Sequence, residues 1–418
     1  MEIAIIGSGI AGISASLFLS KKHNVTIYER NDYIGGHSNT KKVIINNKKI
    51  NVDTGFIVFN KLNYPNLLNL FDFFNIDYEN SDMSLSVSNV NKNIEWSGKS
   101  IKTIFSNTKN IFDIKFIKFL IDIISFNRLV KKNINILTES HEPLGKWLER
   151  KKFGTYFQEN YLVPMSAAIW SSPSKDILEY PISSLFSFFN NHKLLHNKKS
   201  RPQWLTVSKG SQSYIKKILE AQTADLILNS KIQEIRKGNN KIHIINKDGV
   251  DKIFDHVIYA IHPERILEIK SNFDRKELKI LGLFKTSKNK VFLHNDASLM
   301  PKNKKNWSSW NVFSNKNEKR VSITYWMNRL QNIDYQYPLF VSLNPMKIPK
   351  KSSIYYKLDY EHPIYNKSSI LGQNKMEELQ GFNNQWYCGA WLGNGFHEAG
   401  ISTSIKISKN LNGKIPWH

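Results

Sequence analysis

Three glycines near the N-terminus have the spacing that a phosphate-binding turn requires. Gly7, Gly9 and Gly12 form a G-x-G-x-x-G pattern directly after the apolar residues 3–6, and a helical stretch is predicted from residue 13 to about residue 20. The first glycine permits a tight turn, the second lets backbone approach a pyrophosphate, and the third lets helix and strand pack closely. The start of the helix would offer amide groups to the phosphates. The alternative is a glycine turn in an ordinary α/β unit.

An acidic residue near the expected offset favours the dinucleotide interpretation. Residues 24–28 predict a second strand, and Glu29 follows it directly. A carboxylate in this position accepts hydrogen bonds from adenosine ribose hydroxyls in dinucleotide-binding proteins. The order of elements therefore predicts a Rossmann-type site, with Ile10 and Ala11 in the phosphate-binding turn.

A second glycine pair distinguishes between dinucleotides. Gly35 and Gly36 come shortly after Glu29, with Arg30 before them and His37 behind them. A simple NAD dehydrogenase has no use for glycines there, whereas in flavoproteins the chain passes the pyrophosphate again after the second strand. We therefore expect FAD as the cofactor.

A later turn has the same character. Residues 52–56 look like the turn that brings backbone against the isoalloxazine ring of a flavin. We expect Thr54, Gly55 and Phe56 to contribute to this part of the cofactor site.

At this point the sequence resembles the bacterial FAD-dependent oxidoreductases of the amine-oxidase superfamily, and within it a family of predicted NAD/FAD-binding proteins. The resemblance runs nearly from end to end and rests on the order and number of individually weak stretches. These stretches are residues 35–40, 52–60, 161–171, 201–204, 299–301, 307–310, 325–331 and 395–400.

The resemblance implies an α/β fold with two interleaved domains. One is a Rossmann-like FAD-binding domain of the amine-oxidase and glutathione-reductase type, and the other is an α+β substrate-binding domain. We place the FAD-binding domain at residues 1–70, 200–265 and 380–418. The substrate-binding domain would take residues 71–199 and 266–379.

The resemblance also implies an adenine-binding strand and a strand that returns to the FAD-binding domain. Residues 227–236 look like the strand whose backbone brackets the adenine, with Ile232 in the bracketing place. Residues 254–260 resemble the returning strand.

The C-terminal part would complete the cofactor site. Residues 385–390 read as a strand that contains Gly389, with Trp391 directly after it, and Gly400 and Ile401 open a final helix. In relatives the N-terminus of that helix points amide groups at the flavin N1/O2 edge and stabilises reduced flavin.

One residue departs from the superfamily pattern. Relatives carry an acidic residue just after the glycine of the last strand, where it holds the ribityl chain, but here Gly389 is followed by Ala390 and Trp391. The ribityl contact must come from elsewhere, and Glu398 is the candidate.

The candidates for acid–base chemistry are few. In flavoenzymes the isoalloxazine performs the difficult step, while the protein orients substrate and adjusts protons. His397 and Glu398 are the acid–base candidates, with orientation of neighbouring groups as an equal alternative. For His37 a phosphate or structural role is favoured over catalysis. Trp391 and Phe396 would either wall the substrate side of the flavin or belong to the core.

Other aromatic residues and histidines are weaker candidates. Trp310, Tyr325 and Trp326 are pocket-lining hypotheses, and His262 and His294 are interpreted as structural.

Composition excludes several classes of protein. The 418 residues are 41% hydrophobic and 22% charged, which is typical of a globular chain. The single cysteine, Cys388, excludes a disulfide framework and is interpreted as a buried, inert thiol.

No spacing of His, Asp or Glu indicates a metal site, and no run approaches the roughly 18 apolar residues of a spanning helix. No signal peptide precedes the first predicted strand, so we expect a cytoplasmic protein.

The charge is strongly basic, with 59 Lys and Arg residues against 35 Asp and Glu and a formal net charge of +24. A nucleic-acid-binding protein should concentrate charge on one face or tail, but the basic residues are scattered, so we expect no nucleic-acid partner.

The apolar segments 112–130 and 185–189 are interpreted first as core. The alternative is an apolar substrate channel or peripheral contact with an anionic membrane.

These observations predict an FAD-dependent oxidoreductase that removes hydride from an apolar substrate. The resemblance implies a link to membrane fatty-acid modification, because members have been associated with cyclopropane-synthase-like methyltransferases, and a desaturase or dehydrogenase on a lipid or fatty-acyl chain is the specific form. The alternatives are a flavin-dependent fatty-acid isomerase or hydratase without net redox, an amine oxidase, and a basic binding protein on a Rossmann-like scaffold. No second G-x-G-x-x-G occurs, so no separate NADPH domain is expected.

Overall fold

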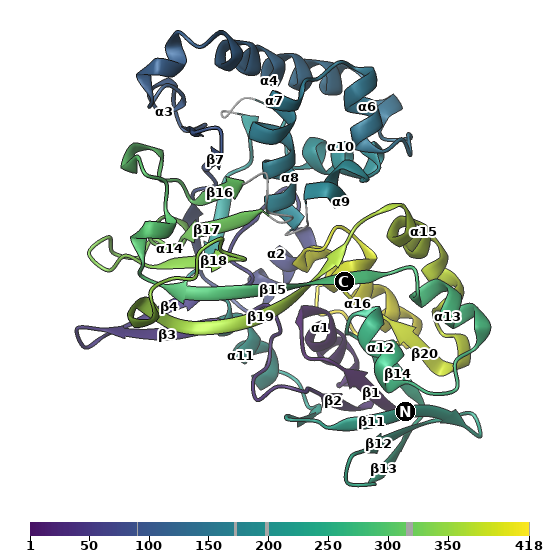
Figure 1. Cartoon of the computed structure of the whole chain (residues 1–418). Coiled ribbons are helices and arrows are strands. Elements are labelled where there is room, and N and C mark those ends of the chain that lie inside the picture. Colours follow the sequence, from purple (N-terminus) through teal and green to yellow (C-terminus); the bar gives the residue numbers. More distant parts are fainter. Residues whose placement is uncertain (90, 171–173, 197–199, 315–320, 418) are drawn as a thin grey trace.

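The computed structural model describes residues 1–89, 91–170, 174–196, 200–314 and 321–417 (Figure 1). A five-stranded parallel sheet has the strand order β10-β2-β1-β14-β20. Strand β1 lies at its centre because Ile3, Ala4 and Ile5 are apolar on both faces and fully buried. The strands are β1 (Glu2–Ile6), β2 (Asn24–Tyr28), β10 (Asp225–Ile227), β14 (His256–Tyr259) and β20 (Gln385–Tyr387).

Helix α1 (Ile10–Leu19) makes the crossover from β1 to the parallel strand β2. All of its residues are buried. Helix α16 (His397–Asn410) packs against α1, and both helices share an apolar cluster with β1, β2 and β14, so they cover the same face of the sheet. The predicted Rossmann-like unit is therefore confirmed, and the predicted second strand has the observed bounds. The helix begins three residues earlier than residue 13.

A second, seven-stranded sheet lies above the first one in the view of Figure 1. Its order is β19-β15-β18-β17-β16-β7-β8, and β16 pairs with β7 in parallel while the other pairs are antiparallel. The strands are β7 (Leu85–Asn89), β8 (Ile94–Ser97), β15 (Lys285–His294), β16 (Trp310–Ser314), β17 (Ser322–Trp326), β18 (Phe340–Leu343) and β19 (Ile354–Ile364).

Three small sheets complete the strand content. A hairpin reverses at Asn46 and Asn47, both with positive φ, as a tight hairpin turn requires. The hairpin strands are β3 (Thr40–Ile45) and β4 (Lys48–Asp53); a second small sheet holds β5 (Phe59–Asn60), β9 (Trp204–Val207) and β6 (Tyr78–Ser81); a third holds β11 (Ile232–Gly238), β12 (Lys241–Asn246) and β13 (Asp251–Phe254).

A helical layer between β8 and β9 forms the top of the molecule in Figure 1. Its interior is aromatic, with Phe126, Trp147 and Phe186 packed together and without exposed surface. Its helices are α3 (Ile101–Ile104), α4 (Ile114–Lys132), α5 (Ile134–Leu137), α6 (Leu144–Arg150), α7 (Thr155–Phe157), α8 (Val163–Trp170), α9 (Ser174–Leu178) and α10 (Ile182–Asn191).

The remaining helices flank the sheets. They are α2 (Pro65–Phe73), α11 (Gln212–Glu220), α12 (Pro263–Ile269), α13 (Arg275–Leu281), α14 (Met327–Leu330) and α15 (Lys367–Lys375). Because β1, β2, β10, β14 and β20 share one sheet, and β7, β8 and β15–β19 share the other, the chain is interleaved between them. The domain boundaries themselves stay a prediction.

Several element predictions were wrong in detail. The single strand predicted at residues 227–236 is divided, because Asn229 adopts a positive φ and the chain bends out of the parallel sheet into β11. The last helix begins at His397 rather than at Gly400. The strand predicted at residues 385–390 ends at Tyr387, and a short 3-10 turn follows at residues 390–392.

The two apolar segments, residues 112–130 and 185–189, differ in how far they are buried. Leu185, Phe186, Phe188 and Phe189 of α10 are buried, as the core interpretation predicted. Helix α4 buries one face and exposes several isoleucines on the other. Among the described residues, no helix combines the length and the apolar character that a membrane crossing requires.

Candidate functional site

A cavity of about 690 Å³ lies at the carboxyl edge of the parallel sheet. Residues just after β1, β2, β14 and β20 line it, namely Gly7, Glu29, Ala260 and Gly389 with their neighbours. Ligands of open α/β sheets bind outside this edge. The opposite wall comes from β19, the seven-stranded sheet and the helical layer, so the cavity joins the two halves of the molecule.

Each glycine of the first turn has a distinct steric role. Gly7 has a φ of +100°, and a Cβ there would lie 2.8 Å from the carbonyl oxygen of Ala260. A Cβ on Gly12 would lie 1.9 Å from the Gly7 oxygen, so Gly12 lets α1 approach β1. Gly9 is different, because a Cβ there would meet nothing within 4 Å and Gly9 lines the cavity. The space beside Gly9 is open to a ligand.

The second glycine pair packs against this turn. The Gly35 amide donates to the Ser8 oxygen at 3.0 Å, and a Cβ on Gly36 would lie 3.1 Å from the Gly9 Cα. Gly36 lines the cavity together with Arg30, so a cation lies at the cavity wall. Gly35 and Gly12 support this wall from behind.

The carboxylate of Glu29 is fixed by four hydrogen bonds. The amide and hydroxyl of Ser8 donate to one oxygen at 3.1 and 2.7 Å, and the amide and side chain of Asn31 donate to the other at 2.9 and 2.7 Å. Glu29 lines the cavity, where a carboxylate accepts from ribose hydroxyls. These bonds hold the carboxylate in place at the cavity wall.

Helix α1 leaves its first amide groups free for a ligand. Its N-cap, Gly9, makes no side-chain capping bond, and Ile10 and Ala11 face the cavity in the first turn. Unpaired helix amides and the positive end of the helix dipole bind phosphate groups.

Histidines form the next part of the wall. His37 is half-buried and stacks on Tyr360 with the ring centres 4.8 Å apart, and the ring centre of His362 lies 5.1 Å away. Burial, and then the neighbouring His262, lowers the pKa of His37 to about 4. The Nε2 atom of His37 and the Nδ1 atom of His262 have no hydrogen-bond partner in the described part of the chain. Buried polar atoms normally have a partner, so these two atoms are available to a ligand.

The turn after β4 is held by the same histidine. The Phe56 amide donates to the His37 oxygen at 2.7 Å, and a Cβ on Gly55 would lie 2.4 Å from that oxygen. The Thr54 hydroxyl donates to the Asn39 oxygen at 2.9 Å. Thr54, Gly55 and Phe56 line the cavity, and so does Ile232 at the start of β11.

His397 reaches the cavity from the N-terminus of α16. Its ring stacks on Phe56 with centres 3.8 Å apart, and its Nε2 atom lies 2.9 Å from the Ser38 hydroxyl. Burial, and then the proximity of His37, lowers the pKa of His397 to about 3. The imidazole is therefore neutral at physiological pH.

Glu398 has a different role from the expected ones. Its carboxylate accepts from the Asn66 and Leu67 amides, both at 3.1 Å, and from the Asn66 side chain at 2.7 Å. Glu398 thus caps α2 and does not line the cavity, so neither a ribityl contact nor acid–base chemistry follows from its position.

Two further predicted residues of α16 pack against α1. A Cβ on Gly400 would lie 2.9 Å from Ile10 Cγ2, and Ile401 is fully buried. Gly389 and Trp391 do line the cavity, and the Trp391 indole donates to the Ile261 oxygen at 3.1 Å. Because α16 begins one turn earlier than expected, the residues that open it toward the cavity are Phe396 and His397.

The far end of the cavity is apolar. It contains two of the three pocket-lining residues predicted from sequence, Trp310 and Tyr325, whereas Trp326 packs against Trp307 outside it. Its apolar wall consists of Ile57, Val58, Met83, Leu85, Met165, Ile169, Trp170, Phe188, Leu194, Trp204, Trp310, Tyr325, Leu343, Tyr365 and Phe396.

Two polar residues at this end had no sequence signal for a site. His192 stacks on Phe188 with ring centres 4.0 Å apart, and burial lowers its pKa to about 4. Arg201 is exposed at the cavity and donates to the Leu194 and His196 oxygens at 2.9 and 3.1 Å. Arg201 is therefore the cation at the apolar end.

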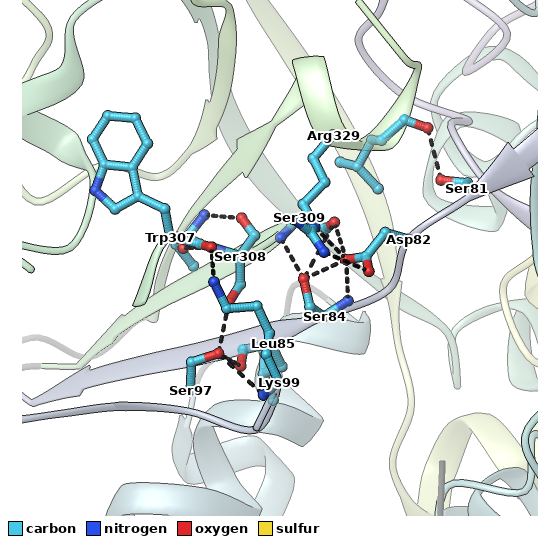
Figure 2. Close-up of polar contacts among 12 residues, drawn as sticks. Ser81, Asp82, Ser84, Leu85, Ser97, Lys99, Trp307, Ser308, Ser309 and Arg329 are labelled. Carbon is cyan, nitrogen blue, oxygen red and sulfur yellow. Dashed lines mark hydrogen bonds and ion pairs between the residues drawn. The ribbon is translucent and has the colours of Figure 1, made fainter. Parts of the chain in front are cut away.

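A polar network fixes the segment that carries Met83 and Leu85 (Figure 2). Asp82 accepts hydrogen bonds from Arg329 Nη2 at 3.1 Å and from the Ser309 hydroxyl at 2.7 Å, and Arg329 Nε forms an ion pair with it at 2.9 Å. Burial alone would raise the pKa of Asp82, but these hydrogen bonds hold it well below its ordinary value. The network joins the β6–β7 connection to the seven-stranded sheet.

Comparison with a sequence model of the family described as "flavin containing amine oxidoreductase" gives a match over residues 10–343. The chain belongs to this family. As a flavin amine oxidoreductase it is an enzyme, and its cofactor is FAD. The open space at Gly9, the fixed Glu29 carboxylate and the unpartnered His37 nitrogen fit that cofactor. A search of the curated proteins found no match to this sequence.

Several solved enzyme structures share the fold of this amine oxidoreductase. A CLA-producing fatty acid isomerase from P. acnes has a TM-score of 0.66 at 14% identity, with 97% of this chain and 98% of that chain covered. Putrescine oxidase bound to putrescine has a TM-score of 0.67 at 10% identity, with 99% of both chains covered. Cyclohexylamine oxidase from Brevibacterium oxydans has a TM-score of 0.67 at 12% identity, with 98% of this chain and 99% of that chain covered.

Proposed function

We propose that this amine oxidoreductase removes hydride from an apolar acyl chain, such as that of a fatty acid or lipid. The observation that carries the proposal is the distribution of charge in the cavity. Among the described lining residues, the acidic ones are Glu29, Glu268, Asp359 and Glu361, and none lies on α8, α10 or β9. An alkylamine cation would find no counter-ion at the apolar end.

Arg201 suits a carboxylate instead. A guanidinium at the end of an apolar cavity complements the anionic head of a fatty acid while the wall contacts the chain. Glu268 and Glu361 are both paired with Arg265, at 2.6 and 2.5 Å, so they do not compete for a cationic substrate. The apolar wall would exclude water and orient the acyl chain by its shape.

FAD, when bound, accepts hydride from the substrate. We propose His397, rather than Glu398, as the residue of α16 that faces the reacting atoms. As a neutral imidazole it is able to hold a hydrogen bond or accept a proton, while its contact with Ser38 fixes the ring. The cofactor contacts inferred for the residues around Gly9, Glu29 and His37 belong to the same proposal.

A fatty-acid isomerase without net redox is the second candidate. It is motivated by the apolar end of the cavity, which suits an acyl chain, together with the fold that this chain shares with the CLA-producing fatty acid isomerase. A cytoplasmic location with peripheral membrane contact is the corresponding proposal for the cellular setting.

The test is anaerobic mixing of the flavin-loaded protein with candidate substrates. Saturated, unsaturated and methylated fatty acids are compared with putrescine and cyclohexylamine, and flavin absorbance and product mass are recorded. Bleaching with a fatty acid and a product lighter by two hydrogens support the proposal. A product of unchanged mass with a shifted double bond indicates the isomerase. Bleaching by an amine and none by any fatty acid would overturn the proposal.

A further inference from the structure

The helical layer carries an unusual concentration of exposed apolar side chains. Eight of the nineteen large apolar residues that are exposed in the described chain fall between residues 101 and 136. Phe112 and Ile114 are 87% and 84% exposed. The eight residues, which we call the α4 face, are Ile101, Ile111, Phe112, Ile114, Ile117, Ile121, Ile124 and Ile136.

The face is a continuous stripe on α4. Ile114, Ile117, Ile121 and Ile124 follow one another at intervals of three and four residues, so they lie on one side of the helix. The opposite side is the one that packs into the protein, through Phe116, Phe119, Phe126 and Val130. The stripe therefore plays no part in the core of this chain.

Basic residues surround the stripe. Residues 101–136 hold seven exposed cationic side chains and two acidic residues, Asp113 and Asp122, and Asp113 is occupied as the N-cap of α4. The cationic residues are Lys102, Lys109, Lys115, Lys118, Arg128, Lys131 and Lys132. An apolar stripe flanked by exposed cations complements a surface of anionic headgroups over acyl chains.

We propose that the α4 face binds an anionic membrane surface, with the isoleucines and Phe112 inserted among the acyl chains. Because α4 is one element of a packed layer rather than a spanning helix, it would lie parallel to the membrane. A second copy of the chain fits less well, because a symmetric contact would bring the two sets of cations together. A nucleic acid would match the cations but not the apolar stripe.

The same layer also builds the apolar end of the cavity. Phe126 on the inner side of α4 packs on Phe157 of α7 with ring centres 5.3 Å apart. A helical run continues from α7 into α8, whose Met165 and Ile169 line the cavity. Membrane contact would thus set the helical layer, and with it the apolar end of the cavity, against the lipid phase. The proposal stands independently of the substrate.

The experiment is flotation of the flavin-loaded protein with vesicles. One preparation holds equal parts of phosphatidylcholine and phosphatidylglycerol, and the other holds phosphatidylcholine alone. The test variant carries Phe112→Ser, Ile114→Ser and Ile121→Ser. The matched control carries Val250→Ser, Ile253→Ser and Ile348→Ser, which are exposed apolar residues outside the face. Flavin content and thermal unfolding report that each variant is folded.

We expect wild type and control to float with the anionic vesicles, and the test variant to partition at least about ten-fold less. Raising the ionic strength to about 1 M should weaken the binding, because the Debye length falls to about 3 Å. Equal partitioning of wild type and test variant would overturn the proposal. So would a wild-type dimer in sedimentation that the test variant loses, because a second copy would then cover the face. Turnover of a soluble substrate is measured in parallel and reports separately on the proposed function.

Discussion

At Gly9, the addition of a single methyl group should impair cofactor binding without affecting the fold. Its φ of −65° and ψ of 178° are open to any residue, and a Cβ would contact no protein atom within 4 Å. We expect Gly9→Ala to leave the unfolding temperature of the flavin-free protein unchanged and to weaken FAD binding by at least about ten-fold, because the methyl group occupies space that the pyrophosphate approaches. Titration of FAD fluorescence measures the dissociation constant.

Gly154 supplies a matched control for this substitution. It is the N-cap of α7 with a φ of −68° and a ψ of 160°, and a Cβ there also meets nothing within 4 Å. Since Gly154 does not line the cavity, Gly154→Ala should bind FAD as the wild type does. Equal affinity of the Gly9 and Gly154 variants would remove Gly9 from the proposed cofactor site.

Arg201 tests substrate recognition at the other end of the cavity. If its guanidinium pairs with a carboxylate, Arg201→Gln should raise KM for a free fatty acid by roughly five- to ten-fold, with a smaller change in kcat. The methyl ester of the same acid is the control, because it carries no charge and should be turned over equally by both proteins. A parallel loss for acid and ester would show that Arg201 acts through its bonds to the Leu194 and His196 carbonyls.

At the scale of elements, the N-terminal unit was predictable because its signals are local. The glycine spacing, the buried strands and Glu29 all occur within the first thirty residues, and the structure places Gly7, Gly9 and Glu29 at the cavity. The start of α16 was missed because its N-cap is Phe396, which makes no side-chain capping bond. Without a Ser, Thr, Asp or Asn signal the sequence does not mark this boundary.

The residues that form the apolar end of the cavity could not be predicted from the sequence. His192 directly follows α10 and Arg201 precedes β9, and they line one cavity with Met165 of α8 and Leu343 of β18 only when these segments pack together. His262 was interpreted as structural, because a lone histidine after a strand has no distinctive spacing. Its position beside His37 depends on the return of β14 next to β1.

The hydrogen bonds and ion pair of Asp82 should stabilise the contact between the β6–β7 connection and the seven-stranded sheet. Asp82→Asn keeps the shape of the side chain but removes the charge that pairs with Arg329, so we expect a loss of roughly 1–3 kcal/mol in the free energy of unfolding. Urea unfolding at neutral pH measures it. Glu377→Gln is the control, because the Glu377–Lys406 pair is exposed at the surface and should contribute little. An Asp82 variant as stable as the control would contradict this role.

At the scale of the whole molecule, buried neutral histidines should make the protein sensitive to acid. Burial lowers the pKa of His37, His192 and His294 to about 4 and that of His397 to about 3. In the unfolded chain these imidazoles bind protons below about pH 6.5, while in the folded protein they stay neutral. Stability is therefore fully present above that pH and falls as the pH drops toward 4.

The expected slope follows from proton linkage. Each additional proton that the unfolded chain binds lowers the free energy of unfolding by about 1.4 kcal/mol per pH unit. Urea unfolding of the flavin-free protein at pH 7, 6 and 5 should show a progressive loss over a range above most carboxylate titrations. His294→Gln should reduce this slope, because His294 lies outside the cavity and is held by Ser342 at 2.8 Å. A stability that is flat across this range would contradict the prediction.

Cys388 directly follows β20 in the centre of the protein and has no exposed surface. Burial raises the pKa of its thiol to about 12, so it is protonated and shielded at neutral pH, where maleimides react with exposed thiolates. Since it is the single cysteine of the chain, a cysteine placed anywhere on the surface would be the sole point of attachment for a fluorophore or spin label. The native protein is thus ready for distance and depth measurements without first removing a residue.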